Sequence, residues 1–432
     1  MSVKKAIVQT LRSSPSEALF RPTEVAHVGI ASEIPALTGL RGVAALMVLG
    51  YHTPWLAGVK ISDLPFGSWL NACDSGVGLF FALSAFLLSR PFWNRLAIGG
   101  DDNGAYQAFL VRRFCRIFPA YLVVVGFSLL FDNRTWTGWG LINLAFHVTA
   151  LQTNFHQNFV WMINNVLWTV SVEVQFYLFL AGVFLIGSRM TLLRRGRGWP
   201  LLAVVIVTGM AADPFYRFLV GSLAPHVPVP LLGGGNPDSS INTWNACYFL
   251  KWFLPGVAAG WLSVVLRAHD PSGTERSWTW VNEATFLLLL FAIAFLISCG
   301  AEGDWRMLKA TGWPLNALLF AGLVFMAPLS RLGNFLFAQR ALLFFGTISY
   351  GLYLWHYPLL RAIGKGSVGL NFGGWPTIFM VAITGLAVSS MVAFLSYQFI
   401  ERPAIESARK CRTFRELWVA WYPRLALIRF QG

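Results

Sequence analysis

Charged residues are scarce in this chain, which carries Asp, Glu, Lys or Arg at only 12% of its 432 positions. Soluble globular domains are charged at about 25% of their positions, so a soluble fold is excluded. Acidic residues are fewer than basic ones, with 19 Asp and Glu against 33 Lys and Arg. Hydrophobic residues make up 56% of the chain and include 36 Phe and 19 Trp. This composition indicates a polytopic membrane protein.

Patterns that would hold a metal or a resident cofactor are also missing. The five cysteines are odd in number, scattered and without metal-ligand spacing. The seven histidines form no His-x-x-x-His pair, and the glycine-rich segment 233–238 lacks the Lys-Ser/Thr ending of a phosphate-binding loop. We therefore expect no bound metal and no permanently bound cofactor.

Long hydrophobic runs are present and approach the length that crosses a hydrocarbon core about 30 Å thick. Ten of them cover residues 37–57, 76–94, 117–132, 168–188, 199–220, 246–266, 281–300, 312–329, 344–361 and 376–400. A further run, 141–151, is too short to span and predicts a re-entrant or interfacial segment. The expected fold class is all-α, with about ten transmembrane helices.

Basic residues predict which ends of these helices face the cytoplasm, because cytoplasmic loops are enriched in Lys and Arg. With the N-terminus inside, 24 of the 33 basic residues fall inside, 8 fall outside and Arg41 lies in the membrane. We expect a cytoplasmic tail over 1–34, a transmembrane domain over 35–405 and a basic cytoplasmic tail over 406–432. The net charge of +14 then reflects orientation and attraction to the anionic bilayer, not nucleic-acid binding.

Two ionisable residues interrupt the first hydrophobic run. Arg41 and His52 are eleven positions apart. Eleven helical steps return to within about 20° of the same face and advance about 16 Å along the axis. Because each ionisable residue in a span costs about 2.5 kcal/mol or more, the pair predicts a functional site.

Three arginines precede the third run. Arg112 and Arg116 lie one helical turn apart with Arg113 beside them, so their guanidinium groups can converge at the inner membrane boundary. Guanidinium groups bind phosphate oxygens through paired hydrogen bonds, and coenzyme A carries suitable phosphates. A topology determinant is the alternative interpretation of the same cluster.

Further polar residues lie within the fourth and ninth runs. Glu173 falls in the outer half of its helix, where it is predicted to partner a catalytic histidine or a polar acceptor, or else to form a structural ion pair. Ser349, Tyr353 and His356 share one helical face, and His356 lies at about the depth of His52. The two histidines are thus predicted to share a cavity, although a single intramembrane histidine can also be a satisfied hydrogen-bonding group.

The outer loop before the fourth run interleaves amides with aromatic residues over positions 152–165. An aromatic belt at the membrane interface explains the aromatic side chains. It does not explain the amides, which end in Asn164 and Asn165. This pattern favours binding of a sugar.

Together these motifs resemble the acyltransferase-3 family of integral membrane O-acyltransferases. The resemblance rests on residues 41–52, 78–84, 112–121, 168–177, 349–358 and 401–403, which occur in the family's order. The chain departs from the family where Ser84-Ala85 replaces a common Ser-Gly pair. The resemblance implies transfer of an acetyl or other short acyl group from cytoplasmic acyl-CoA to a hydroxyl. The implied acceptor is a surface polysaccharide, lipopolysaccharide or lipo-oligosaccharide, and the implied location is the bacterial inner membrane.

Under this hypothesis each residue receives a role by its depth. We assign the acyl-CoA donor to Arg41, Arg112, Arg113, Arg116 and Tyr121. His52 is assigned as general base or nucleophile, with Glu173 and His356 orienting it or the acceptor. Contacts to the acceptor or to a developing oxyanion are assigned to Ser349, Tyr353, Trp168, Ser171, Asn164 and Asn165.

A secondary transporter or flippase of a solute or lipid-linked glycan is the alternative, because intramembrane charges and broken helices also suit translocation. No internal repeat between the two halves is evident, which favours the enzyme. The sequence leaves open the acceptor, the acyl chain, the side on which the acceptor is modified and the oligomeric state.

Overall fold

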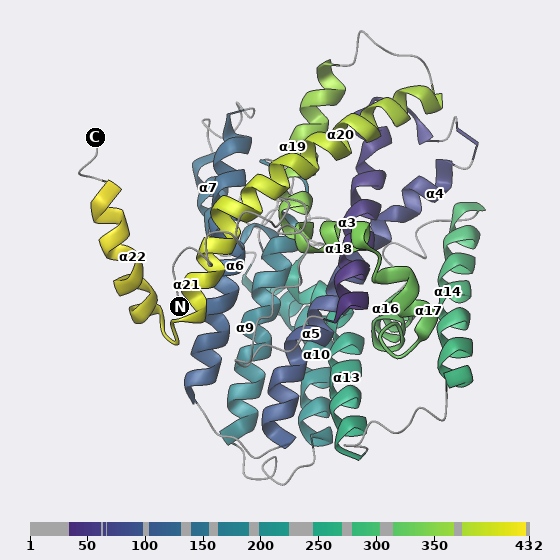
Figure 1. Ribbon diagram of the computed structural model, residues 1–432. Coiled ribbons are helices and arrows are strands. Elements are labelled where there is room, and N and C mark those ends of the chain that lie inside the picture. Colours follow the sequence, from purple (N-terminus) through teal and green to yellow (C-terminus); the bar gives the residue numbers. More distant parts are fainter. Residues whose placement is uncertain are drawn as a thin grey trace, which may run out of the picture. The chain divides into compact units, whose positions relative to one another are not determined.

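The computed structural model describes residues 34–61, 64–65, 67–97, 103–130, 140–154, 163–189, 198–223, 245–269, 279–302, 314–366 and 374–428 (Figure 1). The predicted tail 1–34 thus lies outside the described residues except for its last position. Every regular element in the described ranges is helical, which confirms the all-α fold class.

The longest helices follow the predicted hydrophobic runs. They are α3 (Pro35–Leu56), α5 (Gly76–Ala97), α6 (Asn103–Leu129), α9 (Trp168–Arg189), α10 (Trp199–Leu223), α13 (Ala246–His269), α14 (Thr279–Glu302), α19 (Ser349–Gly366) and α20 (Gly374–Ser396). Shorter helical elements are α4 (Gly67–Ala72), η2 (Cys73–Ser75), α7 (Gly140–Val148), η4 (Gln152–Asn154), α16 (Leu315–Met326), α17 (Arg331–Phe337), α18 (Arg340–Thr347), η9 (Tyr397–Glu401), α21 (Arg402–Arg409) and α22 (Phe414–Ile428).

Five helices of the described residues are long and apolar enough to cross a membrane, or six if a bent pair counts as one span. The predicted number of ten is therefore not confirmed, although the multi-pass class is. The bent pair is α16 and α17, which meet at an angle of 97°. The predicted run 312–329 covers α16 and ends before α17 begins. Glu283 of α14 accepts hydrogen bonds from the Ser330 hydroxyl and the Arg331 amide, both at 2.6 Å, and so holds the start of α17.

Two helices that carry candidate site residues differ from their predicted bounds. Helix α6 begins at Asn103, well before the predicted start at 117, so Arg112, Arg113 and Arg116 lie within one continuous helix. The predicted run 344–361 is instead divided between α18 and α19, and Ser349 is the first residue of α19. The three arginines lower the hydropathy of the first part of α6, so the hydrophobic run begins later than the helix does.

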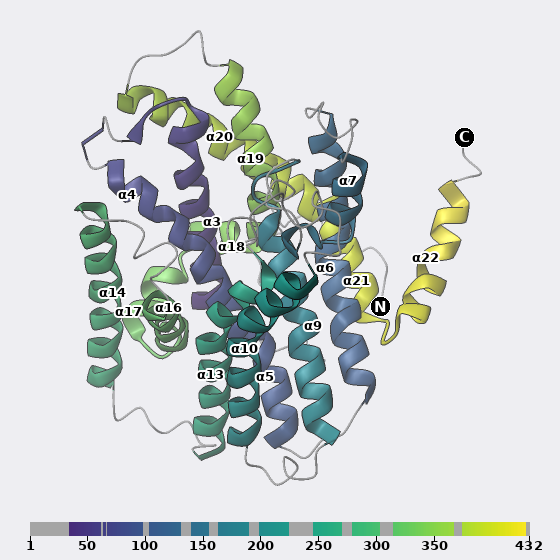
Figure 2. The same cartoon turned by 180° about the vertical axis from the view of Figure 1, so that it is seen from behind.

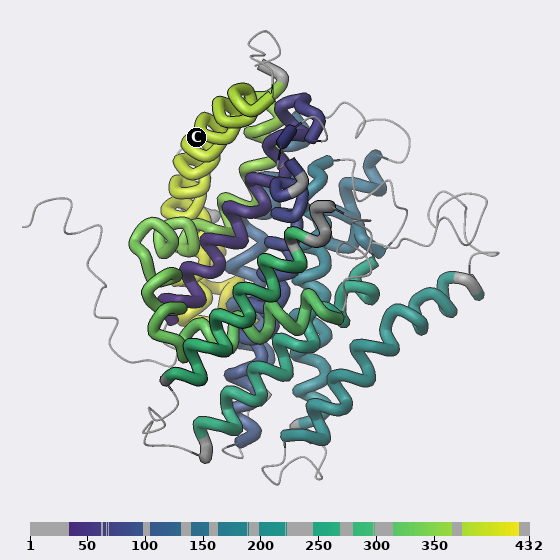
Figure 3. Tube along the Cα trace, turned by 90° about the vertical axis from the view of Figure 1, so that its right-hand side faces the viewer, coloured from purple at the N-terminus to yellow at the C-terminus, as the bar shows by residue number. Residues whose placement is uncertain are grey.

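Aromatic packing fills the centre of the helix bundle. Helix α5 packs against α13, α16 and α3. Figure 2 shows α5, α9 and α13 running alongside one another, and Figure 3 shows the teal tube of α10 slanting away from them. Phe176 of α9 stacks on Phe253 of α13 with ring centroids 3.9 Å apart, and Phe81 of α5 lies 4.5 Å from the same ring. These rings belong to a buried core that joins α5, α6, α9, α10, α13 and α19.

Close glycine contacts hold α3 against its neighbours. A Cβ at Gly346 of α18 would collide with the Thr38 carbonyl oxygen, and one at Gly364 of α19 would collide with the Leu56 carbonyl oxygen. The two glycines therefore let the backbones approach near both ends of α3. This packing determines which side chains of α3 face α19.

Candidate functional site

The two intramembrane histidines meet between α3 and α19. Nε2 of His356 lies 3.2 Å from Nδ1 of His52, and the ring centroids are 5.1 Å apart. His356 is 1% exposed, and His52 is partly buried. The structure thus brings together the two side chains that the sequence predicts at one depth.

The neighbouring carbonyl groups determine which ring nitrogen of each histidine carries a proton. Nδ1 of His356 lies 2.6 Å from the Tyr353 carbonyl and 3.2 Å from the Leu352 carbonyl, so it must be the donor and Nε2 the acceptor. Nδ1 of His52 lies 2.9 Å from the Val48 carbonyl and faces the acceptor nitrogen of His356, so it carries the proton.

The remaining nitrogen of His52, Nε2, is then unprotonated in the neutral ring. It has no hydrogen-bond partner among the described residues. Aromatic rings surround the pair, with the Tyr357 centroid 5.5 Å from His52 and the Tyr353 centroid 5.7 Å from His356. A histidine with a fixed tautomer and a free ring nitrogen can act as a general base or as a nucleophile.

A second polar cluster lies near the other end of the same face of α3. Arg41 interacts electrostatically with Arg116, Arg113 and Glu173, and Glu401 interacts with Arg116 and Arg41. No ion pair joins these three arginines to either carboxylate among the described residues. Three cations and two carboxylates leave the arginine cluster with an excess positive charge that suits an anion.

Glu173 belongs to the arginine cluster and makes no hydrogen bond to either histidine. Its Oε1 accepts hydrogen bonds from the Ser84 hydroxyl at 2.8 Å and from the Tyr177 hydroxyl at 2.5 Å. The guanidinium of Arg113 lies 5.9 Å from the Tyr177 ring centroid. The structure therefore separates Glu173 from the histidine pair, with which the sequence grouped it.

Arg112 differs from its neighbours because it points out of the arginine cluster and is exposed. Ser84, Tyr177 and Glu401 take its place among the residues that shape the cluster. All three lie in the sequence motifs, but the motifs alone indicate no role for them. The spacing of four between Glu173 and Tyr177 puts both on one helical face, and this was the available signal.

The hydroxyl groups of the remaining predicted donor and oxyanion residues make no hydrogen bond to either histidine among the described residues. The Tyr121 hydroxyl donates to the His147 carbonyl at 2.7 Å, which places it in a buried network with Gln152. The Tyr353 hydroxyl lies 2.7 Å from the Thr169 hydroxyl and 3.1 Å from the Val166 carbonyl. Ser349 is fully buried, and its hydroxyl has no partner among the described residues.

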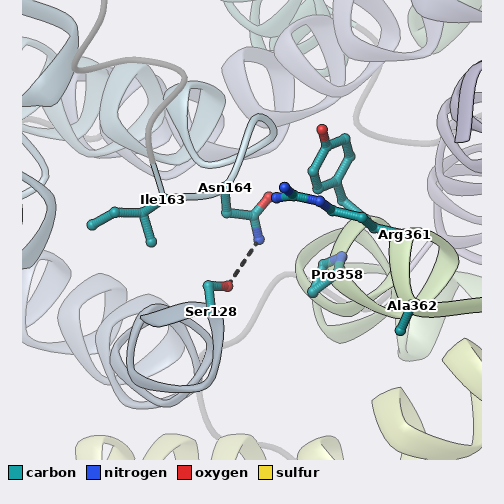
Figure 4. Close-up of a pocket in the computed structure, with 7 residues that line it drawn as sticks. Ser128, Ile163, Asn164, Pro358, Arg361 and Ala362 are labelled. Atoms are coloured by element: carbon teal, nitrogen blue, oxygen red, sulfur yellow. Dashed lines mark hydrogen bonds between the residues drawn. The ribbon is translucent and has the colours of Figure 1, made fainter. Parts of the chain in front are cut away.

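The predicted acceptor residues divide between packing and a pocket. Ser171 hydrogen-bonds to the Ala150 carbonyl at 2.6 Å, and Trp168 packs on Phe249 with centroids 4.8 Å apart. Asn164 instead lines a pocket (Figure 4), whereas Asn165 beside it is partly exposed and is not among the lining residues. The pocket has an empty volume of about 400 Å³, open solvent included, and is lined by Ser128, Ile163, Asn164, Tyr357, Pro358, Arg361 and Ala362.

Comparison with protein families identifies this architecture. The family model described as an acyltransferase domain, acyltransferase-3, matches residues 34–394. The chain belongs to the acyltransferase-3 family. That range holds the histidine pair, the three clustered arginines and Glu173. Together with the apolar helices, membership of this membrane family makes the chain a multi-pass membrane protein.

Individual relatives carry related names. The chain is 28% identical over 388 residues to "Putative peptidoglycan O-acetyltransferase YrhL" of Bacillus subtilis, covering 86% of this chain and 54% of that protein. It is 26% identical over 399 residues to peptidoglycan O-acetyltransferase OatA of Listeria monocytogenes, covering 86% and 55%. It is 25% identical over 418 residues to a Staphylococcus aureus protein named "Putative O-acetyltransferase", covering 91% and 61%.

These relatives are longer than the present chain, which spans little more than half of their length. No solved structure is significantly similar to it.

Proposed function

We propose that this acyltransferase-3 protein transfers an acetyl or other short acyl group from acyl-CoA to a hydroxyl of a carbohydrate-containing acceptor. The observation that carries the proposal is the hydrogen-bonding of the histidine pair. The N–H at Nδ1 of His52 donates to the Val48 carbonyl and to Nε2 of His356, so that Nε2 of His52 is left as a free base. A fixed and unprotonated ring nitrogen is what acyl transfer to a hydroxyl requires.

The donor site is proposed at the arginine cluster. Phosphate oxygens of coenzyme A would balance the excess positive charge of Arg41, Arg113 and Arg116, which have no ion-pair partner of their own among the described residues. Arg41 and His52 share one face of α3 about 16 Å apart. An extended donor could thus bind at its phosphates and present its thioester near His52.

Two reaction sequences are compatible with this geometry. In the first, Nε2 of His52 takes the proton of the acceptor hydroxyl while its oxygen attacks the thioester carbonyl; the coenzyme A sulfur then leaves and receives that proton. In the second, Nε2 attacks the thioester carbonyl and expels the coenzyme A thiolate, which forms an acyl-His52. The acceptor hydroxyl then attacks this acyl group, Nε2 leaves, and the hydroxyl proton goes to the thiolate. In both routes, Nε2 of His356 accepts a hydrogen bond from the N–H at Nδ1 of His52, and this contact orients the His52 ring.

The acceptor is proposed to be a surface polysaccharide, lipopolysaccharide or lipo-oligosaccharide, and the protein is proposed to lie in the bacterial inner membrane. Two of the relatives are named for peptidoglycan, which supports a carbohydrate acceptor. Asn164 lines a pocket beside the Tyr357 ring that contacts His52, and this supports acceptor binding there.

The proposal is tested with the purified protein in lipid nanodiscs, supplied with radiolabelled acetyl-CoA and candidate glycans. We expect acceptor-dependent release of coenzyme A and labelled glycan, both lost in His52→Gln. The control is His147→Gln, which removes a histidine of α7 that shares no hydrogen bond or ring contact with His52 or His356 among the described residues.

The same assay separates the two sequences, because release of one equivalent of coenzyme A without acceptor indicates the acyl-histidine route. Retained turnover in His52→Gln would remove His52 from the mechanism. Gradient-driven glycan flux without acetyl-CoA would overturn the proposal in favour of a transporter.

A further inference from the structure

The pocket beside the histidine pair contains one charged side chain, Arg361. It lies on α19 five residues beyond His356, which is about 7.5 Å further along the helix axis. Among the described residues Arg361 has no carboxylate and no hydrogen-bond acceptor. Figure 4 shows its guanidinium directed toward the Asn164 side chain across the pocket.

The uncharged polar groups of the pocket also present donors. The amide oxygen of Asn164 accepts one hydrogen bond, from the Val166 backbone amide at 3.2 Å. Its amide nitrogen lies 3.5 Å from the Ser128 hydroxyl, which makes the hydroxyl oxygen an acceptor. The hydroxyl proton of Ser128 and the second amide proton of Asn164 then remain for a ligand, since no described residue accepts them.

A pocket of donors around an arginine is complementary to an oxyanion, because carboxylates and phosphates only accept hydrogen bonds. Its other walls are apolar, formed by Ile163, Pro358 and Ala362 with the ring of Tyr357. Such a combination of apolar walls and few convergent polar groups is typical of a ligand site. The hydrogen-bond donors therefore favour a negatively charged ligand group, and the apolar walls can accommodate a sugar ring.

The pocket lies next to the histidine pair. The Tyr357 ring lines the pocket and lies edge-on to His52, with centroids 5.5 Å apart. An acceptor whose oxyanion binds Arg361 would thus place a nearby hydroxyl toward His52. We infer that the pocket binds a carboxylate or phosphate of the acceptor, so that the acceptor is an acidic glycan. This inference rests on the proposed function and adds the acceptor's charge to it.

The test compares three small acceptors with the purified protein: methyl glucuronide, glucose 1-phosphate and the neutral methyl glucoside. We expect the anionic acceptors to be preferred and Arg361→Gln to raise their KM by about 10-fold to 100-fold, the range for losing a charge-assisted hydrogen bond. The KM of the neutral acceptor should not change, and Arg361→Lys should recover part of the preference. Comparing the two anionic acceptors shows whether the pocket prefers a sugar carboxylate or a glycosyl phosphate.

Lys60→Gln is the matched control, because it removes one exposed positive charge outside the pocket. Calorimetric binding of the same compounds, without acetyl-CoA, makes the inference independent of turnover. Arg361-dependent binding without any transfer would contradict the proposed function and leave the anion site standing. Transfer without preference for charge, or an equal effect of Arg361→Gln on all three acceptors, would overturn the inference alone.

Discussion

At the scale of single residues, hydrogen-bond direction decides what each histidine can do. The carbonyl groups of Leu352 and Tyr353 bind one nitrogen of His356 and turn the other toward His52. His356 therefore positions His52 and needs no contact with substrate. Nδ1 of His52 has two acceptors, the Val48 carbonyl on its own helix and Nε2 of His356, and His356 is the one that orients the ring toward α19.

Substitution of His356 tests this orienting role. We expect His356→Phe to lower kcat by a factor on the order of 10², the lower end of the general-base contribution, without changing the KM for acyl-CoA. His356→Gln, whose amide oxygen can accept the Nδ1 proton, should retain more activity than His356→Phe. Steady-state kinetics in nanodiscs measure both parameters. Equal losses in the two variants would contradict the positioning role.

Arg112 and Arg113 form a matched pair for the donor site. Arg113 lies in the arginine cluster, whereas Arg112 is exposed beside it. We expect Arg113→Ala to weaken acyl-CoA binding by about 10-fold to 100-fold, because a charge-assisted hydrogen bond is lost. Arg112→Ala should bind as the wild type does. Equilibrium binding of labelled coenzyme A measures the affinity of each variant. Equal weakening by the two substitutions would favour a general effect of surface charge.

Glu173 balances positive charge in the arginine cluster. Glu173→Gln keeps an acceptor for Ser84 and Tyr177 but removes one of two carboxylates near three arginines. We expect a lower Tm for the unliganded protein and a larger increase in Tm on adding coenzyme A, since the ligand's phosphates replace the lost charge. Thermal unfolding with and without coenzyme A measures the difference. An unchanged coenzyme A response would show that Glu173 acts elsewhere.

At the scale of elements, the site depends on how closely α3 approaches its neighbours. Gly364 of α19 faces the Leu56 carbonyl of α3, whereas Gly50 within α3 has no atom within 4 Å of the position of a Cβ. Both glycines lie on the pair of helices that carries the two histidines. Replacing each of them by Ala therefore compares a substitution that changes the spacing between the helices with one that changes helix propensity alone.

Gly364→Ala should force α3 and α19 apart and lengthen the contact between the histidines. Because a misplacement of 1 Å can cost about 10²-fold in rate, we expect a loss of this order in kcat. Gly50→Ala should leave kcat unchanged. The comparison requires kinetics on folded protein, checked by size-exclusion chromatography, and equal activity of the two variants would contradict the close-packing argument.

At the scale of the whole molecule, the distribution of charge predicts orientation in the membrane. The basic residues predict that Lys60, after α3, lies outside and that Arg409, at the end of α21, lies in the cytoplasm. In a cysteine-free background, Lys60→Cys should react with an impermeant maleimide on intact cells. Arg409→Cys should react only after the cells are permeabilised. Labelling of both from outside would require another topology.

Much of this architecture follows from the sequence alone. The scarcity of charge and the long apolar runs determine a helical membrane protein, because each backbone group in lipid must be hydrogen-bonded within its own segment. The fixed period of the helix places Arg41 and His52 on one face of α3 whatever surrounds it. The ordered motifs predict the acyltransferase-3 family, which the family match confirms.

Tertiary packing alone determines which side chains meet. Glu173 contacts Ser84 across α5 and α9, and the sequence could not show this because helix rotation depends on the neighbouring helices. The bend between α16 and α17 depends on a carboxylate from α14 far away in the chain. The contact between His52 and His356 depends on α19, because α3 alone offers Nδ1 of His52 only the Val48 carbonyl. The sequence by itself thus determined the helices and their polar residues, and the packing of those helices decided the site that they form.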